Sequence, residues 1–180
     1  MKIETERLIL RHYKETDWKS VHEYASLPDF SQYEMWGPNS IEDTKKFIFD
    51  AVKKSKADPK FQFEFAVCLK ENNQHIGGCD IRRSTQHSNV ADMGWAMNPK
   101  FQSKGYITEA GAALIDFGFS KLNLAVIYAT CDTRNTASFR VMEKLNMKRV
   151  GHTIGDRKID CQIYNSYRYE ITNKRELCQQ

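Results

Sequence analysis

The stretch that decides the fold reads VADMGWAMNPKFQSKGYITEAGAALIDFG and spans residues 90–118. Its first part, residues 90–97, is largely apolar and predicts a strand, which Asn98 and Pro99 end. Beyond Gly105, apolar side chains recur every three or four residues, which is the spacing of one helix face: Ile107, Ala110, Leu114 and Phe117. The stretch therefore predicts a strand, a short turn and an amphipathic helix from about Gly105 to Lys121.

The turn between this strand and this helix is a candidate anion site. A helix that begins directly after a strand points free backbone N–H groups outward, and their partial positive charge attracts an anion. Gly105 allows close approach to the backbone, and Lys104 adds a point charge. A diphosphate is the natural occupant. An ordinary strand-to-helix turn remains the alternative, because one glycine is a weak signature.

The residues before this stretch predict strands and two helices. Strands are expected at 8–11, 61–69, 75–82 and 90–97, the last three forming an antiparallel meander with Asn72 and Asn73 at one turn. The first helix is expected to have Thr16 as its N-cap and apolar residues at 18, 21, 24 and 25. Ser40 is the expected cap of the second helix, which ends at residues 57–59.

The residues after this stretch return to alternating elements. A strand is expected at 124–131 and a helix at 135–145, with Asn146 in the left-handed position at its end. Closing strands are expected at 150–154 and 161–171, joined by Gly155 and Asp156. The order of elements predicts one mixed α/β domain over residues 1–180.

Composition excludes several classes of protein. The chain has 180 residues, 41% of them hydrophobic, and 27 Lys and Arg against 23 Asp and Glu give a net charge of +4. No apolar run approaches about 18 residues, and the first residues do not form a secretory signal, so no membrane association is expected. The small surplus of charge is interspersed with acids, which argues against a nucleic-acid partner.

The cysteines and histidines indicate neither a metal site nor a disulfide framework. The five cysteines are scattered and form no C-x-x-C pair, and the histidines form no H-E-x-x-H motif. We therefore expect no bound metal, and reduced thiols point to the cytoplasm.

A second group of polar residues follows the strand at 125–129. Asn135 and Ser138 lie at the N-cap and N3 positions of the predicted helix, which is a sufficient structural reason for both. A ligand role is compatible with capping, because both side chains lie at the exposed mouth of that helix.

The motifs in their order resemble those of the GCN5-related N-acetyltransferase (GNAT) superfamily. The resemblance is to the branch that includes ribosomal-protein N-terminal acetyltransferases, and it covers almost the whole chain. The motifs lie at residues 4–11, 76–78, 94–99, 105–110, 135–138, 145–151 and 160–164. It implies the α/β (α+β) GNAT fold, a central mixed, mostly antiparallel sheet flanked by helices.

The resemblance implies acetyl-CoA as the donor and assigns residues to it. The pyrophosphate loop would be Gln102, Ser103, Lys104, Gly105, Tyr106 and Ile107, where Ile107 departs from the small residue of the family pattern. Pantetheine would pair with the strand edge at Ala96, Met97 and Asn98 and bond to Asn135. Ser138 would lie near the thioester sulfur.

The resemblance also suggests the residues of the reaction. Asp92 is the favoured base, matching a catalytic glutamate of histone-acetylating relatives, although an ordinary salt bridge is an equal alternative; Glu64 is a weaker candidate. The backbone N–H of Met97 is the expected oxyanion donor, and Ser138 or Tyr164 would protonate or orient the leaving thiolate. For Tyr164, a core aromatic residue with a hydrogen-bonded hydroxyl is the favoured alternative. Glu109 and Cys131 are interpreted as structural.

The expected acceptor is a primary amine. Neutralising a lysine amine of pKa about 10.4 at neutral pH costs about 4 kcal/mol, whereas an N-terminal amine of pKa about 7.7 costs well under about 1 kcal/mol. An N-terminal α-amine of a protein or peptide is therefore favoured over a small amine or a non-catalytic CoA-binding role. Phe30, Tyr33 and Trp36 form the candidate acceptor pocket, with core filling as the equal alternative. A homodimer is left open.

Overall fold

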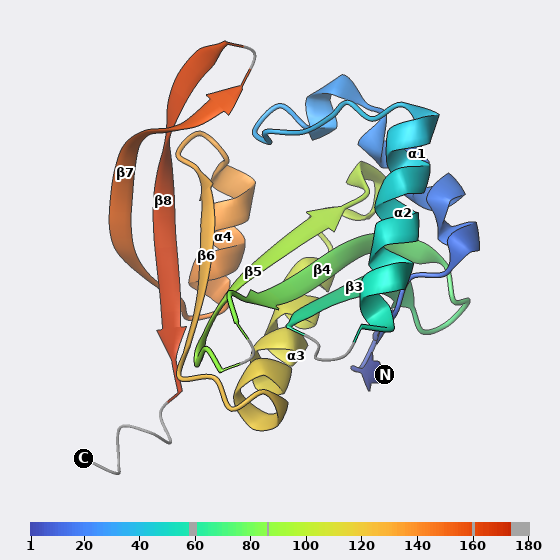
Figure 1. The fold of residues 1–180 in the computed structure, drawn as a ribbon, viewed down its shortest axis with the longest axis horizontal. Helices are drawn as coiled ribbons and strands as arrows, with labels where there is room; N and C mark the ends of the chain where they lie inside the picture. The colour runs from blue at the N-terminus through green and yellow to red at the C-terminus, as the bar shows by residue number, and fades with distance from the viewer. Residues whose placement is uncertain (58–60, 86, 160, 174–180) are drawn as a thin grey trace.

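The computed structural model describes residues 1–57, 61–85, 87–159 and 161–173, which form a mixed sheet with helices on both faces (Figure 1). The sheet has the order β1-β2-β3-β4-β5-β6-β8-β7. The strands are β1 (Lys2–Glu4), β2 (Leu8–Arg11), β3 (Gln62–Leu69), β4 (His75–Arg83), β5 (Val90–Met97), β6 (Val126–Asp132), β7 (Lys148–Ile159) and β8 (Gln162–Thr172). The helices are α1 (Trp18–Ala25), α2 (Ile41–Ser55), α3 (Tyr106–Lys121) and α4 (Thr136–Lys144), with short 3-10 turns η1 (Glu15–Asp17), η2 (Pro28–Phe30) and η3 (Pro99–Phe101).

Neighbouring strands are antiparallel except for β5 and β6, which confirms the mixed, mostly antiparallel sheet and the β3–β4–β5 meander. The parallel pair is short: its register runs only from Val90 opposite Val126 to Asp92 opposite Tyr128. Beyond Asp92 the two strands separate, as Figure 1 shows. The second half of β5 therefore has a strand on one side and an open edge on the other.

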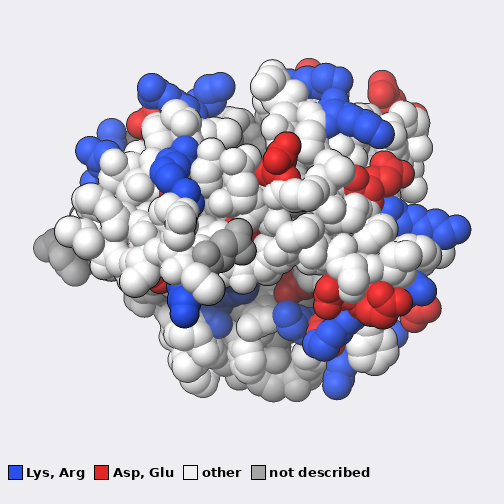
Figure 2. Space-filling view, turned by 90° about the horizontal axis from the view of Figure 1, so that it is seen from above, with Lys and Arg blue, Asp and Glu red and all other residues white. Residues whose placement is uncertain are grey.

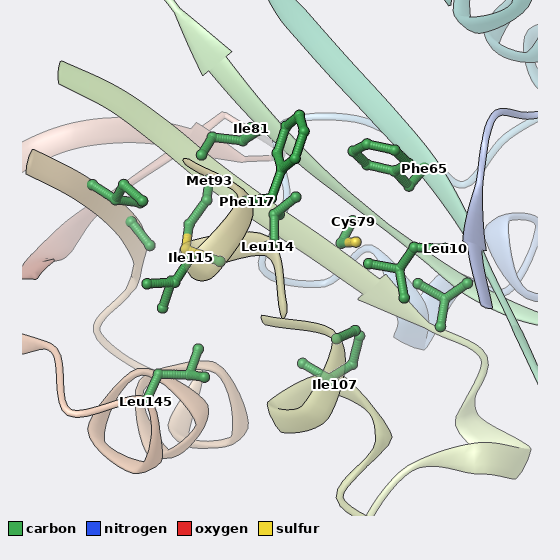
Figure 3. Packing of buried hydrophobic residues seen from close by; sticks show 14 of the residues in the cluster. Leu10, Phe65, Cys79, Ile81, Met93, Ile107, Leu114, Ile115, Phe117 and Leu145 are labelled. Atoms are coloured by element: carbon green, nitrogen blue, oxygen red, sulfur yellow. The ribbon is translucent and has the colours of Figure 1, made fainter. Parts of the chain in front are cut away.

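Alternation along the strands divides the core between the two sheet faces. Odd-numbered β3 residues such as Phe65 pack with the buried face of α3, where Leu114 and Phe117 lie (Figure 3). On the opposite face, Ala66 packs with residues of α1 and α2, including Tyr24. On the face that Figure 2 shows, Lys and Arg side chains are spread over several places rather than gathered in one patch. In the part of the chain described, no helix is long and apolar enough to cross a membrane.

The starts of the helices follow the sequence closely, with one exception. Ser40 Oγ accepts a hydrogen bond from the Asp43 amide at 3.1 Å, and Asn135 Oδ1 accepts one from the Ser138 amide at 3.0 Å, so both predicted caps are confirmed. The prediction of Thr16 as a cap is wrong. Thr16 lies inside η1, and α1 begins only after Asp17, whose carboxylate accepts hydrogen bonds from Arg11 and from the Lys14 amide.

The C-terminal hairpin differs from the prediction. We expected Gly155 and Asp156 to form its turn, but β7 continues through them to Ile159. Gly155 has a φ of +72°, and the register shifts between Thr153 and Arg157, so the glycine marks an irregularity within a long strand. Cys161 is a turn residue with a φ of 64°, and β8 begins at Gln162. Asp58, Pro59 and Asp160, which the sequence motifs included, lie outside the described residues.

The packing of α3 generates a stability prediction. Leu114 is completely buried, so Leu114→Ala should lower the free energy of unfolding by about 2–5 kcal/mol, measured by urea denaturation. Asp116→Ala on the exposed side of the same helix is the control and should change it by less than about 0.5 kcal/mol. Equal effects of the two substitutions would contradict the assignment of the buried face.

Candidate active site

A cavity of about 1780 Å³ opens where β5 separates from β6. It is continuous across the edge of β5. At one end it is lined by the turn before α3 and by the start of α4, and at the other by strand residues that face α1 and α2 and by the loop before α2. The lining includes Gly105, Ser138, Met97, Asp80, Asp92 and Trp36.

The turn before α3 presents unpaired backbone amides to this cavity. The first helical hydrogen bond runs from the Glu109 amide to the Gly105 carbonyl at 3.0 Å, so the amides of residues 106–108 precede the helical ladder. Ser103 and Gly105 have φ values of 62° and 80°, and the left-handed conformation at both folds the turn back on itself. This arrangement, with residues 102–105 exposed, suits an anion.

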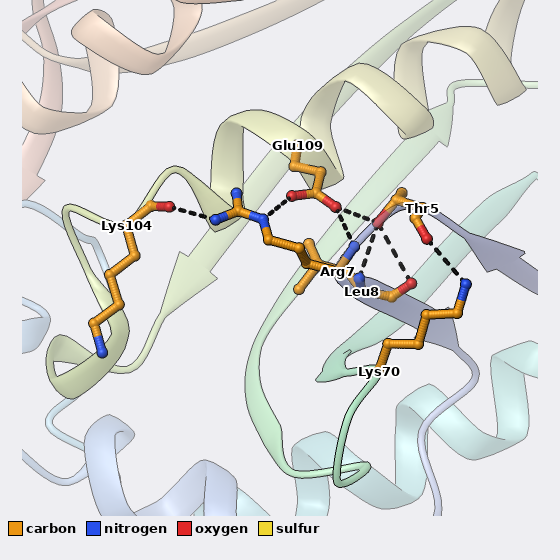
Figure 4. A network of polar contacts seen from close by, with 6 residues as sticks. All are labelled: Thr5, Arg7, Leu8, Lys70, Lys104 and Glu109. Atoms are coloured by element: carbon orange, nitrogen blue, oxygen red, sulfur yellow. Dashed lines mark hydrogen bonds and ion pairs between the residues drawn. The ribbon is translucent and has the colours of Figure 1, made fainter.

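A brace from the N-terminal segment holds this turn in place (Figure 4). Glu109 accepts hydrogen bonds from Thr5 Oγ1, from the Arg7 amide at 2.8 Å and from Arg7 Nε at 2.7 Å. Arg7 Nη1 also donates to the Lys104 carbonyl at 3.1 Å. Burial alone would raise the pKa of Glu109, but the hydrogen bonds from Thr5 and Arg7 outweigh it and lower that pKa. The structural interpretation of Glu109 is confirmed.

Side chains of the turn have roles that the sequence did not reveal. Gln102 Nε2 donates to the Met97 carbonyl at 3.1 Å, which ties the turn to the end of β5. The Lys104 ammonium lies 5.5 Å from the centre of the Phe101 ring. Ile107 is 9% exposed and belongs to the core below the turn (Figure 3), so its size does not obstruct the backbone amides.

The open edge of β5 offers hydrogen-bonding groups beside the turn. The Asn98 amide bonds to the Ile76 carbonyl of β4 at 2.9 Å. The alternation of an antiparallel ladder then directs the N–H groups of Trp95 and Met97 away from β4, to the side where β6 has separated. Ala96 lies between them with its side chain toward the α1–α2 cluster. The Asn98 side chain accepts from the Lys100 amide at 3.1 Å, so it shapes the turn rather than the cavity.

The start of α4 forms the opposite wall. Asn135 and Ser138 both line the cavity while Asn135 caps the helix, so the capping role and exposure to the cavity coexist. Cys131, at the end of β6, is 4% exposed, and burial raises the pKa of its thiol to about 11. A neutral thiol is a poor nucleophile, which supports the structural interpretation of this cysteine.

Ionisable side chains line the part of the cavity that faces α1 and α2. Asp92 Oδ2 accepts hydrogen bonds from Arg82 Nε at 3.0 Å and Arg82 Nη2 at 2.5 Å. Arg82 Nε also lies 3.0 Å from Asp80 Oδ2. Glu64 is paired with Lys54 of α2 at 2.8 Å. Asp80 was not among the sequence-predicted residues, because a single polar residue in an apolar strand does not reveal whether it faces solvent or a cavity.

The predicted aromatic residues lie where the loop before α2 closes the cavity. Phe30, Tyr33 and Trp36 all line it, and Phe30 also packs on Tyr24 with ring centroids 4.9 Å apart, so cavity lining and core filling are both present. Arg157 of β7 donates to the Tyr33 carbonyl at 3.0 Å, which ties the loop to the C-terminal hairpin.

Tyr164 of β8 lies opposite Arg157 in the pairing of β7 and β8. Its hydroxyl donates to Gln162, and the guanidinium of Arg134 lies 3.3 Å from its ring centre. It is not among the residues that line the cavity. Its predicted role toward a leaving thiolate therefore has no geometric support.

Comparison with known proteins identifies the family. The family model described as the acetyltransferase (GNAT) domain matches residues 7–148. The chain belongs to the GNAT family. An uncharacterized N-acetyltransferase of Bacillus subtilis (strain 168), YnaD, is 36% identical over 151 residues, which are 84% of this chain and 85% of the relative. The protein is an acetyl-CoA-dependent N-acetyltransferase.

Solved structures agree with this assignment. A GNAT-family acetyltransferase from Bacillus anthracis is 34% identical, with a TM-score of 0.84 over 96% of this chain and 98% of that one. Two more distant structures share the fold: a ribosomal L7/L12 α-N-protein acetyltransferase with coenzyme A (16% identical, TM-score 0.84, covering 96% and 98%) and the Vibrio cholerae spermidine N-acetyltransferase with CoA and spermine (18%, 0.81, 96% and 99%). Among the described residues of the GNAT chain, no group of three or more His, Cys, Asp or Glu is placed to hold a metal ion.

The brace at Glu109 generates a pH-dependent prediction. Glu109→Gln should lower the free energy of unfolding at pH 7 by about 1–3 kcal/mol, because the amide cannot accept all three hydrogen bonds. The folded-state pKa is lowered, so the stabilisation is complete above the unfolded value of 4.5 and is lost as the pH falls through the folded value.

Urea denaturation at pH 7 and at successively lower pH checks both statements. The difference between wild type and Glu109→Gln should narrow below about pH 4.5. Glu143→Gln, which removes an exposed ion pair with Arg140, is the control and should cost less than about 1 kcal/mol at any pH. A difference at Glu109 that stays constant with pH would contradict the role of its charge.

Proposed function

We propose that the acetyltransferase transfers the acetyl group of acetyl-CoA directly to the N-terminal α-amine of a protein or peptide, in a ternary complex. The observation that carries this proposal is the continuity of the cavity. One space joins the unpaired amides before α3 to the ionisable and aromatic residues facing α1 and α2, and it passes the open edge of β5. Donor and acceptor can therefore meet across a single strand edge.

The donor occupies the side of the cavity nearest α3 and α4. The amides before α3 hold the diphosphate of CoA, with Ser103, Lys104, Gly105 and Tyr106 around it, and Gln102 fixes the turn to β5. Pantetheine lies along the open edge of β5 at Ala96 and Met97 and near Asn135, while Asn98, bonded to Ile76 and Lys100, shapes the turn beside it. The Met97 N–H then donates to the thioester oxygen as negative charge develops on it, and Ser138 lies near the sulfur.

Direct transfer is favoured over a covalent enzyme intermediate. The thiol of Cys131 is buried and its pKa is raised, so it is a poor attacking group at neutral pH. An N-terminal amine is substantially neutral near pH 7.7 and can attack without a strong base. Asp92, the base that the sequence favours, accepts two hydrogen bonds from Arg82. These bonds favour its charged form and make it a weaker proton acceptor.

A small polyamine is the second candidate acceptor. The Vibrio cholerae spermidine acetyltransferase shares the fold, and Glu64, Asp80 and Asp92 supply negative charge on the acceptor side of the cavity. Lys54 and Arg82 offset much of that charge, which favours an acceptor with a single amine.

We place the enzyme in the cytoplasm as one catalytic domain, since the described cysteines are free thiols and the sheet extends from residue 2 to residue 172.

Acetyl-CoA binding can be tested by thermal denaturation. Acetyl-CoA at about 100 times its Kd should raise the Tm by roughly 5–10 °C. Gly105→Val should abolish the rise, because a side chain at a φ of 80° strains the turn and lies 3.4 Å from Arg7. Gly151→Val in β7, where a Cβ meets only Arg168 at 3.4 Å, is the control and should keep it. An unchanged Tm of the wild type with saturating acetyl-CoA would contradict the assigned donor site.

The acceptor can be tested by release of free thiol from acetyl-CoA. Peptides with a free N-terminus should be substrates, whereas the same peptides with a blocked N-terminus and an internal lysine should react at least about 100-fold more slowly, because the lysine amine is protonated. Spermidine and spermine form a parallel arm. A higher rate with the polyamines than with the peptides would contradict an N-terminal acceptor and support a polyamine acceptor instead. Binding of acetyl-CoA without turnover of any amine would indicate a non-catalytic module.

A further inference from the structure

We propose that Asp80 of β4, rather than Asp92 of β5, accepts the proton from the attacking amine. This inference rests on the proposed function, because it needs an amine acceptor in the cavity beside β5. Asp80 and Asp92 both line that cavity and both lie beside Arg82. They differ in the position of the carboxylate and in the hydrogen bonds that each carboxylate already accepts.

The position of Asp80 is set by the register of β4 and β5. Asp80 lies directly opposite Gly94, and a Cβ built at residue 94 would be 3.1 Å from Asp80 Oδ1. The carboxylate thus lies over the Gly94 backbone. Glycine has no side chain, so the space above this backbone is open to the carboxylate. Ala96, the next residue of β5 on this face, is about 7 Å further along and directly precedes Met97. Asp80 therefore lies beside the strand edge where the thioester is expected.

Asp92 is less suited to accept a proton. Its Oδ2 accepts two hydrogen bonds from Arg82, a strong arrangement that favours the charged carboxylate. Asp80 Oδ2 lies 3.0 Å from Arg82 Nε, but the two atoms do not have hydrogen-bond geometry, and this buried oxygen has no hydrogen-bond partner among the described residues. Asp92, opposite Arg82, lies two residues further from Met97 along β5 than Gly94 does. Arg82 therefore holds Asp92 in place and leaves Asp80 able to bind a proton.

The charges around Asp80 tune its proton affinity from every adjacent element. Burial is the largest cause that raises the pKa of Asp80, to about 6. Repulsion from Asp92 of β5 and Glu64 of β3 contributes to this increase, whereas Arg82 of β4 and Lys54 of α2 oppose it. A carboxylate with this pKa is ionised at neutral pH and retains more affinity for a proton than an exposed aspartate.

The transfer step is balanced with this assignment. The amine nitrogen attacks the thioester carbon, the C–N bond forms, and the carbonyl electrons move onto the oxygen facing the Met97 N–H. The proton on the nitrogen, which becomes strongly acidic once the bond has formed, passes to Asp80. The electrons on the oxygen then re-form the C=O bond as the C–S bond breaks, and the thiolate leaves with its electron pair. Ser138 donates a proton to the thiolate and regains one from solvent, and Asp80 returns its proton to solvent.

The test is the pH dependence of kcat/KM for the acceptor, measured at saturating acetyl-CoA with the wild type, Asp80→Asn, Asp92→Asn and Arg82→Met. Below pH 6 the wild-type kcat/KM should fall steeply, because both the amine and Asp80 become protonated. Asp80→Asn should lower kcat/KM by about 10²–10⁴-fold and leave only the titration of the amine. The acetyl-CoA-induced rise in Tm should persist in this variant.

Asp92→Asn and Arg82→Met keep Asp80 and should shift the inflection that it produces in the pH profile of kcat/KM. Asp92→Asn removes a repelling charge, so the inflection near pH 6 should move lower; Arg82→Met removes an attracting one, so it should move higher. These opposite shifts test the inference even if Asp80→Asn fails to fold, and a merely structural Asp80 would give neither. Loss of the inflection in Asp92→Asn, or an Asp80→Asn enzyme within about threefold of wild type, would overturn it.

Failure of this inference is distinguishable from failure of the proposed function. Wild-type turnover of an amine with an unaffected Asp80→Asn variant would leave the proposed function standing and remove Asp80 from it. A wild type that releases no thiol with any amine would overturn both.

Discussion

Beyond Asp92, the edge of β5 loses its parallel partner β6, and the arrangement of the whole site follows from this separation. A strand edge without a partner leaves backbone N–H and C=O groups that must find hydrogen bonds elsewhere, at a cost of about 1–3 kcal/mol for each buried group left unpaired. The protein supplies one partner itself, since Gln102 bonds to the Met97 carbonyl. The remaining groups face a cavity, where a bound molecule can complete the ladder.

Two helix N-termini converge on this gap for the same reason. The chain must cross from β5 to β6 through α3 and leave β6 through α4, so both helices begin near the ends of the separated strands. The unpaired amides before α3 and the open edge of β5 provide hydrogen-bond donors along the cavity, whereas the Thr136 and Ser138 amides of α4 are already bonded to Arg134 and Asn135. Arg7 and Glu109 keep the first of these helices in register with the sheet, which explains the polar N-terminal segment before β2.

Much of the fold could be predicted from local signals, and the exceptions have identifiable causes. Residues 90–118 predicted β5, the turn and α3, because a strand period, a proline and a helical period follow one another there. The bulge at Gly155 was mistaken for a turn, because a glycine in a polar segment is typical of both. β1 was missed, since three residues are too few to show a period. The environment of Asp80 depends on register with β3 and β5, which no local pattern encodes.

The hydrogen bond from Arg157 to the Tyr33 carbonyl joins residues 124 positions apart in the chain. During synthesis from the N-terminus, Tyr33 and the turn before α3 leave the ribosome before Arg157 does. The hydrogen bond that ties the loop before α2 to β7 can therefore form only once the C-terminal hairpin is present. A substitution in the C-terminal hairpin can consequently reshape the side of the cavity lined by Tyr33 and Arg157 without contacting the turn before α3.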